Sequence, residues 1–297
     1  FKGHELAFAM GMQVALARLG TAGALSLSLP IAKEFGGVSS SIALGASLLC
    51  AGVISFLVYC VMDRKLDKSV NETPESESEE SFKFAHLSLL FGNKGFWYIT
   101  LLCLMFYAGV FPFLKFATKI MVMKYGVEEE LAGWIPSMLP YGTSVLTPQF
   151  GYIYDRVGKG ATLMLIGSIL LTIVHIVFAI PGITSVGIAV CMMVVLGVAF
   201  GLVPSAMWPS VPKIIPMHLL GTAYAVIFYI QNIGLSMVPI AIGKINQANT
   251  NAEGIINYTQ TMSTFAAFGV IAIIISFLLL REDGKKGYGL EKANIAK

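Results

Sequence analysis

The sequence predicts an all-α fold, a bundle of helices that cross a membrane. Hydrophobic residues make up 56% of the chain and charged residues 12%, with a mean hydropathy of +0.76. A soluble domain carries about 25% charged residues, so this composition excludes one. The apolar residues are also gathered into eight stretches, each near the roughly 20 residues that a helix needs to cross a bilayer. The chain is therefore predicted to be a multi-pass membrane protein.

The eight predicted spans account for most of the chain. They are Leu6 to Ile31, Ser40 to Met62, Gly95 to Leu114, Leu131 to Tyr152, Ala161 to Ile180, Val186 to Trp208, Leu220 to Ile242 and Tyr258 to Leu280. Pro209 and Pro212 follow the sixth span, and we expect them to break its helix because proline cannot donate a backbone hydrogen bond. A short amphiphilic crossing, Pro216 to Leu220, then leads into the seventh span.

Basic residues predict the orientation of the spans, because cytoplasmic segments carry an excess of lysine and arginine. With Phe1 inside, the inner segments hold Lys2, Arg64, Lys65, Lys68, Lys83, Lys94, Arg156, Lys159, Lys213, Arg281, Lys285, Lys286, Lys292 and Lys297, and the outer ones Lys33, Lys115, Lys119, Lys124 and Lys244. Both ends of the chain are therefore assigned to the cytoplasm.

One long polar run, DRKLDKSVNETPESESEESFKF from Asp63 to Phe84, separates the first two spans from the other six. It is rich in Ser and Glu and too poor in apolar residues to build a core. We interpret residues 1–62 as the last two helices of an N-terminal bundle, 63–94 as a flexible cytoplasmic linker, 95–281 as a C-terminal six-helix bundle and 282–297 as a cytoplasmic tail. Because the chain starts at Phe1 without an initiator Met, we expect it to be a piece of a longer protein.

Two segments of the chain resemble each other, as duplicated halves of transporters do. A single shift lays His4 on His218 and Arg18 on Asn232, so that LARLG and IQNIG occupy equivalent places. Solute sites in such proteins lie near the bilayer midplane, where the repeats meet. We therefore expect Arg18 and Asn232 to face one shared interior.

Arg18 is the leading candidate for binding a solute. It lies more than two turns from either end of its span, where a charged side chain is costly and functional by default. A guanidinium matches a carboxylate in a bidentate way that an ammonium does not. The alternative is a structural ion pair with an acid on a helix outside this chain.

Five further polar or aromatic residues are candidates to line the same cavity. Gln231 and Asn232 offer amides to a peptide backbone, or else hydrogen bonds between helices. Trp208 suits a substrate ammonium, or else belongs to an interfacial belt. Tyr107 and Tyr229 either line the cavity or serve as packing.

The connection GYIYDRVGKG between the fourth and fifth spans is the most specific local motif. Gly151 and Gly158 allow a tight turn, while Asp155, Arg156 and Lys159 form a charge cluster at the inner membrane edge. This loop is similar to the Gly-x-x-x-Asp-Arg-x-Gly-Arg/Lys loop of the major facilitator superfamily.

The resemblance extends over the whole chain, to the branch of that superfamily containing the lysosomal dipeptide uniporters. AMWPSV, IIPMHLLGTAYAV and IQNIGLSMVPIAIG resemble its tenth and eleventh helices, and FKGHELAFAMGMQVALARLG its fifth. The resemblance implies a major facilitator fold without its first four helices, and alternating access that moves small zwitterions such as dipeptides. It implies further that Arg18 binds the substrate carboxylate, that Trp208 is a cavity aromatic, and that Asp155 caps a neighbouring helix in one conformation.

Other classes of function find little support in the sequence. It has no His-Glu-x-x-His or Gly-x-Ser-x-Gly motif and no paired intramembrane carboxylates, so we expect no enzyme, metal or cofactor. The net charge of +3 is spread over the loops and favours no nucleic acid. No Asp or Glu lies in the middle of a span, which favours uniport, and the one deeply placed histidine, His175, is expected to bond a neighbouring helix rather than relay a proton.

The remaining alternative is a receptor or accessory subunit that has kept the transporter fold. The expected partners are a small solute, the lipid bilayer and the missing helices of the same protein. The short loops favour a bacterial cytoplasmic membrane, with a lysosomal membrane as the alternative.

Overall fold

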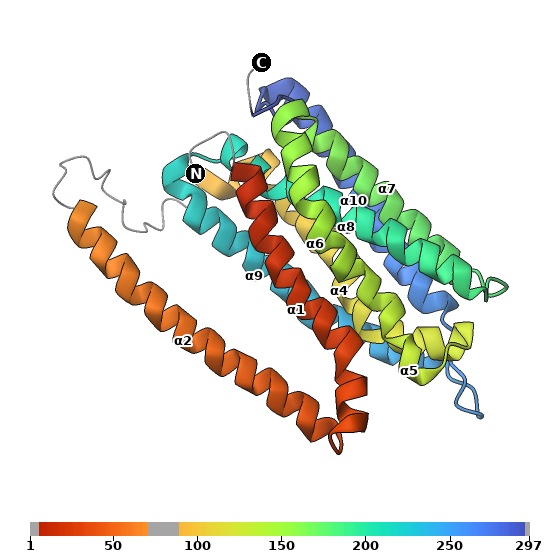
Figure 1. Ribbon diagram of the computed structural model, residues 1–297. Coiled ribbons are helices and arrows are strands. Elements are labelled where there is room, and N and C mark those ends of the chain that lie inside the picture. The colour runs from red at the N-terminus through yellow and green to blue at the C-terminus, as the bar shows by residue number, and fades with distance from the viewer. Residues whose placement is uncertain (1–5, 71–88, 295–297) are drawn as a thin grey trace. The chain divides into compact units, whose positions relative to one another are not determined.

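The computed structural model describes residues 6–70 and 89–294, and within them the chain is helical apart from short connections. Its elements are α1 (Leu6–Glu34), α2 (Val38–Val70), α4 (Lys94–Tyr125), α5 (Glu129–Ala132), α6 (Trp134–Val157), α7 (Gly160–Ala179), α8 (Val186–Ile214), the 3₁₀ helix η1 (Met217–Leu219), α9 (Leu220–Ala248) and α10 (Thr259–Lys286). The all-α prediction is confirmed (Figure 1).

Seven helices of the described residues are long and apolar enough to cross a membrane. Each of the eight predicted spans corresponds to a long helix of the described residues, and α6 is the one that this measure of length and hydropathy leaves out. Its 24 residues reach about 36 Å, enough for a bilayer core of about 30 Å. Its mean hydropathy is lowered by polar residues such as Ser137, Thr143 and Thr147. All three face the interior of the protein and are buried.

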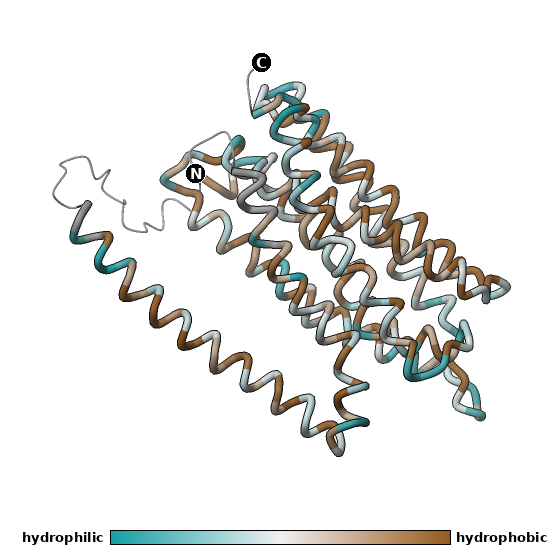
Figure 2. Tube along the Cα trace, in the orientation of Figure 1, coloured by the Kyte–Doolittle hydropathy of each residue, from teal (hydrophilic) through white to brown (hydrophobic). Residues whose placement is uncertain are grey.

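The structure divides into two compact units, Phe1–Leu25 with Phe82–Lys297, and Ser26–Ser81. In the second unit, α2 is apolar along most of its length (Figure 2), and none of its described side chains is buried. The helix continues to Val70, eight residues into the predicted linker, because its charged end is rich in good helix formers such as Arg64, Lys65 and Leu66. The rest of the predicted linker up to residue 88 lies outside the described residues.

The six helices after the linker form one packed bundle. α10 packs against α7 and α4, α8 against α6 and α7, and α9 against α4 (Figure 1). Large aromatic side chains that are almost fully buried fill the space between them: Phe96, Phe106, Phe113, Phe178, Phe200 and Phe265.

Both ends of α4 are fixed by hydrogen bonds that stop the helix. At its start the Asn93 side chain accepts from the amides of Gly95 (2.9 Å) and Phe96 (3.4 Å). At its end Gly126 takes the left-handed conformation, with φ of 67°, and donates to the Val122 carbonyl, while Val127 donates to the Met121 carbonyl. The bond from Gly126 to Val122 is that of an αL cap, and it explains why the chain turns there.

The predicted break at Pro209 and Pro212 is wrong, because α8 runs unbroken to Ile214. Pro212 has no amide to donate to the carbonyl of Trp208, four residues earlier. The hydroxyl of Tyr224 on α9 donates to that carbonyl instead, at 3.1 Å. A neighbouring helix therefore satisfies the group that the proline leaves open, as helices within membranes require.

Candidate substrate site

Arg18 lies against the C-terminal bundle on the face of α1 that carries two buried alanines, Ala15 and Ala22. Its guanidinium carbon is 4.5 Å from the ring centre of Phe200 on α8 and 4.9 Å from that of Phe111 on α4. The small alanines on either side let α1 approach closely enough for this contact. Two aromatic faces thus hold the cation in place, each worth about 0.5 to 2 kcal/mol.

One hydrogen-bond donor of this guanidinium is buried without an acceptor within the described residues. Its Nε is buried and has no hydrogen-bond partner, and Arg18 forms no ion pair there. A cation held by rings alone, without an anion, is a site with a charge left to neutralise. Its fork of donors suits a carboxylate.

A continuous aromatic cluster leads from Arg18 across three helices. Tyr107 lies 5.5 Å from both Phe111 and Phe200, and its hydroxyl accepts a hydrogen bond from Trp208 Nε1 at 3.2 Å. The Trp208 ring in turn stacks on Phe228 of α9, with ring centres 4.8 Å apart and planes 25° apart. Trp208 is only 6% exposed, so it is not an interfacial belt residue.

The candidate residues on α9 take two different environments. Gln231 is buried, and its side-chain oxygen accepts a hydrogen bond from Cys103 Sγ on α4 at 3.1 Å, which is the interhelical role. Asn232 is exposed and donates to the Phe228 carbonyl of its own helix at 2.8 Å, and Tyr229 is 70% exposed. No hydrogen bond joins Asn232 to Arg18 among the described residues, so their shared interior stays a prediction.

The sequence reasoning found three members of the cluster, Arg18, Tyr107 and Trp208, and missed Phe111, Phe200 and Phe228. For Phe111 and Phe228 a signal was present in their spacing. Tyr107 and Phe111 lie one turn apart on α4, as Tyr224 and Phe228 do on α9. Residues four apart share a helix face, so each pair indicates an aromatic face.

The loop between α6 and α7 is held by the C-terminal segment, residues 287–294. The Asp155 carboxylate accepts from the Asn294 side chain at 2.6 Å, and the Asp155 carbonyl accepts from the Asn294 amide at 2.9 Å. Glu291 accepts from the Thr162 amide (3.0 Å) and hydroxyl (2.8 Å), which places a carboxylate at the start of α7. The predicted tail is thus part of the folded bundle as far as Asn294.

The other residues of the predicted loop motif differ in backbone conformation, burial and contacts. Gly158 has φ of 75° and Lys159 has φ of 63°, and the Lys159 ammonium is 3.8 Å from Glu291. Gly151 is buried within α6, whereas Arg156 is exposed over the Tyr152 ring at 4.4 Å.

His175 bonds a neighbouring helix, as predicted. Its Nε2 lies 2.9 Å from the carbonyl of Gly109 on α4, and its ring packs against Phe113 and Phe265. This contact ties α7 to α4 behind the aromatic cluster.

Comparisons with known proteins identify the family of this chain. The Major Facilitator Superfamily model matches residues 1–239. The "Lysosomal dipeptide transporter MFSD1" of Gallus gallus is 28% identical over 288 residues, which cover 94% of this chain and 63% of that protein. The Homo sapiens protein of the same name is 26% identical over 302 residues, covering 96% of this chain and 61% of its own. The chain thus spans less than two thirds of these relatives.

A solved structure shares the fold. It is a mutant of peptide transporter POT in complex with alafosfalin, with a TM-score of 0.54 and 19% identity over 68% of this chain and 40% of that one. The match of the superfamily model over most of the chain, with the helical bundle and its charged inner loop, settles the family: the chain belongs to the major facilitator superfamily.

Proposed function

We propose that the complete protein carries dipeptides or similar small zwitterions across a membrane by alternating access. The observation that carries the proposal is Arg18, a guanidinium held between Phe111 and Phe200 with no anion of its own among the described residues. A substrate carboxylate supplies the missing charge. The MFSD1 relatives, named as lysosomal dipeptide transporters, support both this substrate class and a lysosomal membrane in place of the bacterial one.

The rest of the cluster offers a wall for the other parts of a dipeptide. Tyr107 and Trp208 present rings beside the guanidinium, and these suit the substrate's ammonium or an aromatic side chain. Gln231, bonded to Cys103, holds α9 to α4 and serves the site as a support. Asn232 and Tyr229 lie on the exposed side of α9. In the proposal they contact the substrate on the side that faces the helices outside this chain.

Alternating access needs two bundles, and the proposal assigns them as the sequence suggests. α1 and α2 are the last two helices of the N-terminal bundle, and α4 to α10 form the C-terminal one. The α6–α7 loop with Asp155 biases the exchange between states, because a charge at a helix end contributes only about 0.3 to 1 kcal/mol and is readily reversed.

Dipeptide flux in proteoliposomes made from the complete protein tests this proposal. We expect uptake driven by the dipeptide gradient alone, abolished in Arg18→Ala, slowed in Asp155→Asn and unchanged in Lys244→Ala, an exposed cation at the outer end of α9. Dependence on a pH gradient would change the assignment from uniport to symport. Full transport by Arg18→Ala would remove the proposed site, and no flux by the native protein would favour the receptor alternative.

A further inference from the structure

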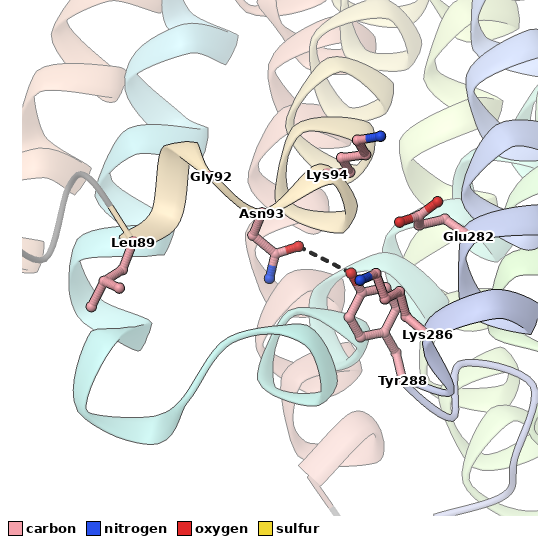
Figure 3. A pocket seen from close by; sticks show the side chains of 7 residues that line it. All are labelled: Leu89, Gly92, Asn93, Lys94, Glu282, Lys286 and Tyr288. Atoms are coloured by element: carbon pink, nitrogen blue, oxygen red, sulfur yellow. Dashed lines mark hydrogen bonds between the residues drawn. The ribbon is translucent and has the colours of Figure 1, made fainter.

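A cavity lies at the ends of α4 and α10 that we assign to the cytoplasmic side, about 25 Å along α4 from the Arg18 cluster. This open cavity has a volume of about 530 Å³, and its walls are polar on the α10 side and partly apolar on the other. Figure 3 shows the residues that line it. The residues that line it are Leu89, Gly92, Asn93, Lys94, Glu282, Lys286 and Tyr288. None of them takes part in the proposed transport.

The neutral polar residues of this cavity already have partners, whereas its charged residues do not. Tyr288 donates its hydroxyl to Asn93 Oδ1 at 3.2 Å, and the Asn93 amide donates to the Ile214 carbonyl at 3.3 Å. Lys94, Glu282 and Lys286 form no ion pair with one another, or with any other residue of the described ranges. As far as the described residues go, two cations and one anion therefore have no ion-pair partner around one open space, Lys94 on α4 and the other two on α10 (Figure 3).

An exposed apolar stripe on α10 leads toward these charges from the membrane side. Ile274, Leu278, Glu282 and Lys286 follow each other at four-residue intervals, so each neighbours the next along a row that winds slowly around α10. Ile274 is 54% exposed and Leu278 36% exposed. This row thus changes from apolar to charged where the helix leaves the membrane. A lipid molecule changes in the same way from its acyl chains to its headgroup.

The same membrane edge carries an aromatic anchor. Trp97, on the first turn of α4, stacks on Phe91 with ring centres 5.6 Å apart and donates its Nε1 hydrogen to the Phe91 carbonyl. Tryptophan is enriched at the level of lipid headgroups. A cavity beside such an anchor is well placed to receive a lipid headgroup.

We propose that this cavity binds the headgroup of an aminophospholipid from the cytoplasmic leaflet. Lys94 and Lys286 hold its phosphate, Glu282 holds its ammonium, and an acyl chain follows Ile274 and Leu278. The charges favour this class over others: phosphatidylglycerol has no ammonium for Glu282, and the quaternary ammonium of phosphatidylcholine donates no hydrogen bond.

Lipid retention by the complete purified protein, measured by native mass spectrometry, tests the inference. Protein from vesicles of equal phosphatidylethanolamine, phosphatidylserine, phosphatidylglycerol and phosphatidylcholine is expected to retain the two aminophospholipids. The double variant Lys94→Gln, Lys286→Gln should lower their retention about tenfold, because two charge-assisted contacts to phosphate are lost. Glu282→Gln should reverse the preference for phosphatidylethanolamine over phosphatidylglycerol.

Lys285→Gln is the matched control, because Lys285 neighbours Lys286 in sequence but does not line the cavity. It should retain lipid as the native protein does. Equal loss in Lys285→Gln and in the double variant would show only a general effect of surface charge and would overturn the proposal. Equal retention of all four lipids by the native protein would do the same.

A soluble competitor separates a lipid site from a site for small phosphates. Glycerophosphoethanolamine carries the same headgroup without acyl chains, and we expect it not to displace bound phosphatidylethanolamine at millimolar concentration. Displacement would assign the cavity to a soluble phosphate ester and overturn the lipid proposal. The result is independent of transport, since none of these residues contacts the Arg18 cluster.

Discussion

At the scale of single residues, Trp208 shows how one side chain joins three helices. Its indole donates a hydrogen bond to the Tyr107 hydroxyl on α4, and its ring stacks on Phe228 of α9. Its backbone carbonyl accepts a hydrogen bond from the Tyr224 hydroxyl, also on α9. The last bond has a particular importance, because Pro212 leaves that carbonyl without its helical donor.

Tyr224→Phe therefore tests the importance of this hydrogen bond between helices. We expect a loss of about 0.6 to 2 kcal/mol in the free energy of unfolding, the range for such bonds in membranes. The measurement is denaturant unfolding in detergent micelles. Tyr229→Phe is the control and should change nothing, since Tyr229 is exposed and forms no hydrogen bond among the described residues. Equal stability of both variants would show that water or another group satisfies the carbonyl.

The residue scale also shows what could be read from the sequence. The position of Arg18 within an apolar span made it a candidate, because an intramembrane charge is costly whatever surrounds it. Its partners Phe111 and Phe200 could not be found in this way. Aromatic residues are common in apolar helices, and only the packing of α1 on α4 and α8 decides which of them meet the guanidinium.

At the scale of elements, the C-terminal segment explains why the α6–α7 loop contains glycine. A Cβ on Gly158 would lie 2.5 Å from the Lys292 carbonyl carbon, and the backbone there has φ of 75°. The loop and the tail thus fit only if this position has no side chain. The tail seemed a free end in the sequence because its contacts come from residues far apart along the chain.

Gly158→Ala should accordingly loosen the tail from the loop. We expect a melting temperature lowered by several degrees and faster proteolysis after Lys292, because both strain and a steric clash act at one site. Gly182→Ala is the control, since a Cβ there meets nothing within 4 Å and its backbone is unstrained. A melting temperature lowered equally by both substitutions would contradict the tail contact.

The positions of the long helices were predicted better than their ends and breaks. Hydropathy located all eight long helices, because the bilayer imposes a minimum apolar length. It did not show that α8 continues through Pro209 and Pro212, since the compensating hydroxyl comes from α9. Nor did it distinguish α6 from the more apolar helices. The polar residues of α6 are buried inside the bundle.

At the scale of the whole molecule, the internal repeat was informative about the family but not about the site. It equated Arg18 with Asn232, yet a repeat relates positions on helices and does not fix the neighbours of each side chain. On α9, Phe228 lies one turn before Asn232 and stacks on Trp208 of the aromatic cluster.

The central claim is that Arg18 binds the carboxylate of the substrate. The most direct test is a thermodynamic cycle in which Arg18 of the protein and the carboxylate of the substrate are each changed, singly and together. Transport of a free dipeptide and of its C-terminal amide is compared in the complete native protein and in Arg18→Ala. If the guanidinium meets the carboxylate, the native protein prefers the free dipeptide by at least about tenfold in kcat/KM, and Arg18→Ala loses this preference. If Arg18 instead pairs with an acid of the missing helices, the variant loses activity toward both substrates and keeps the preference, which would contradict the account.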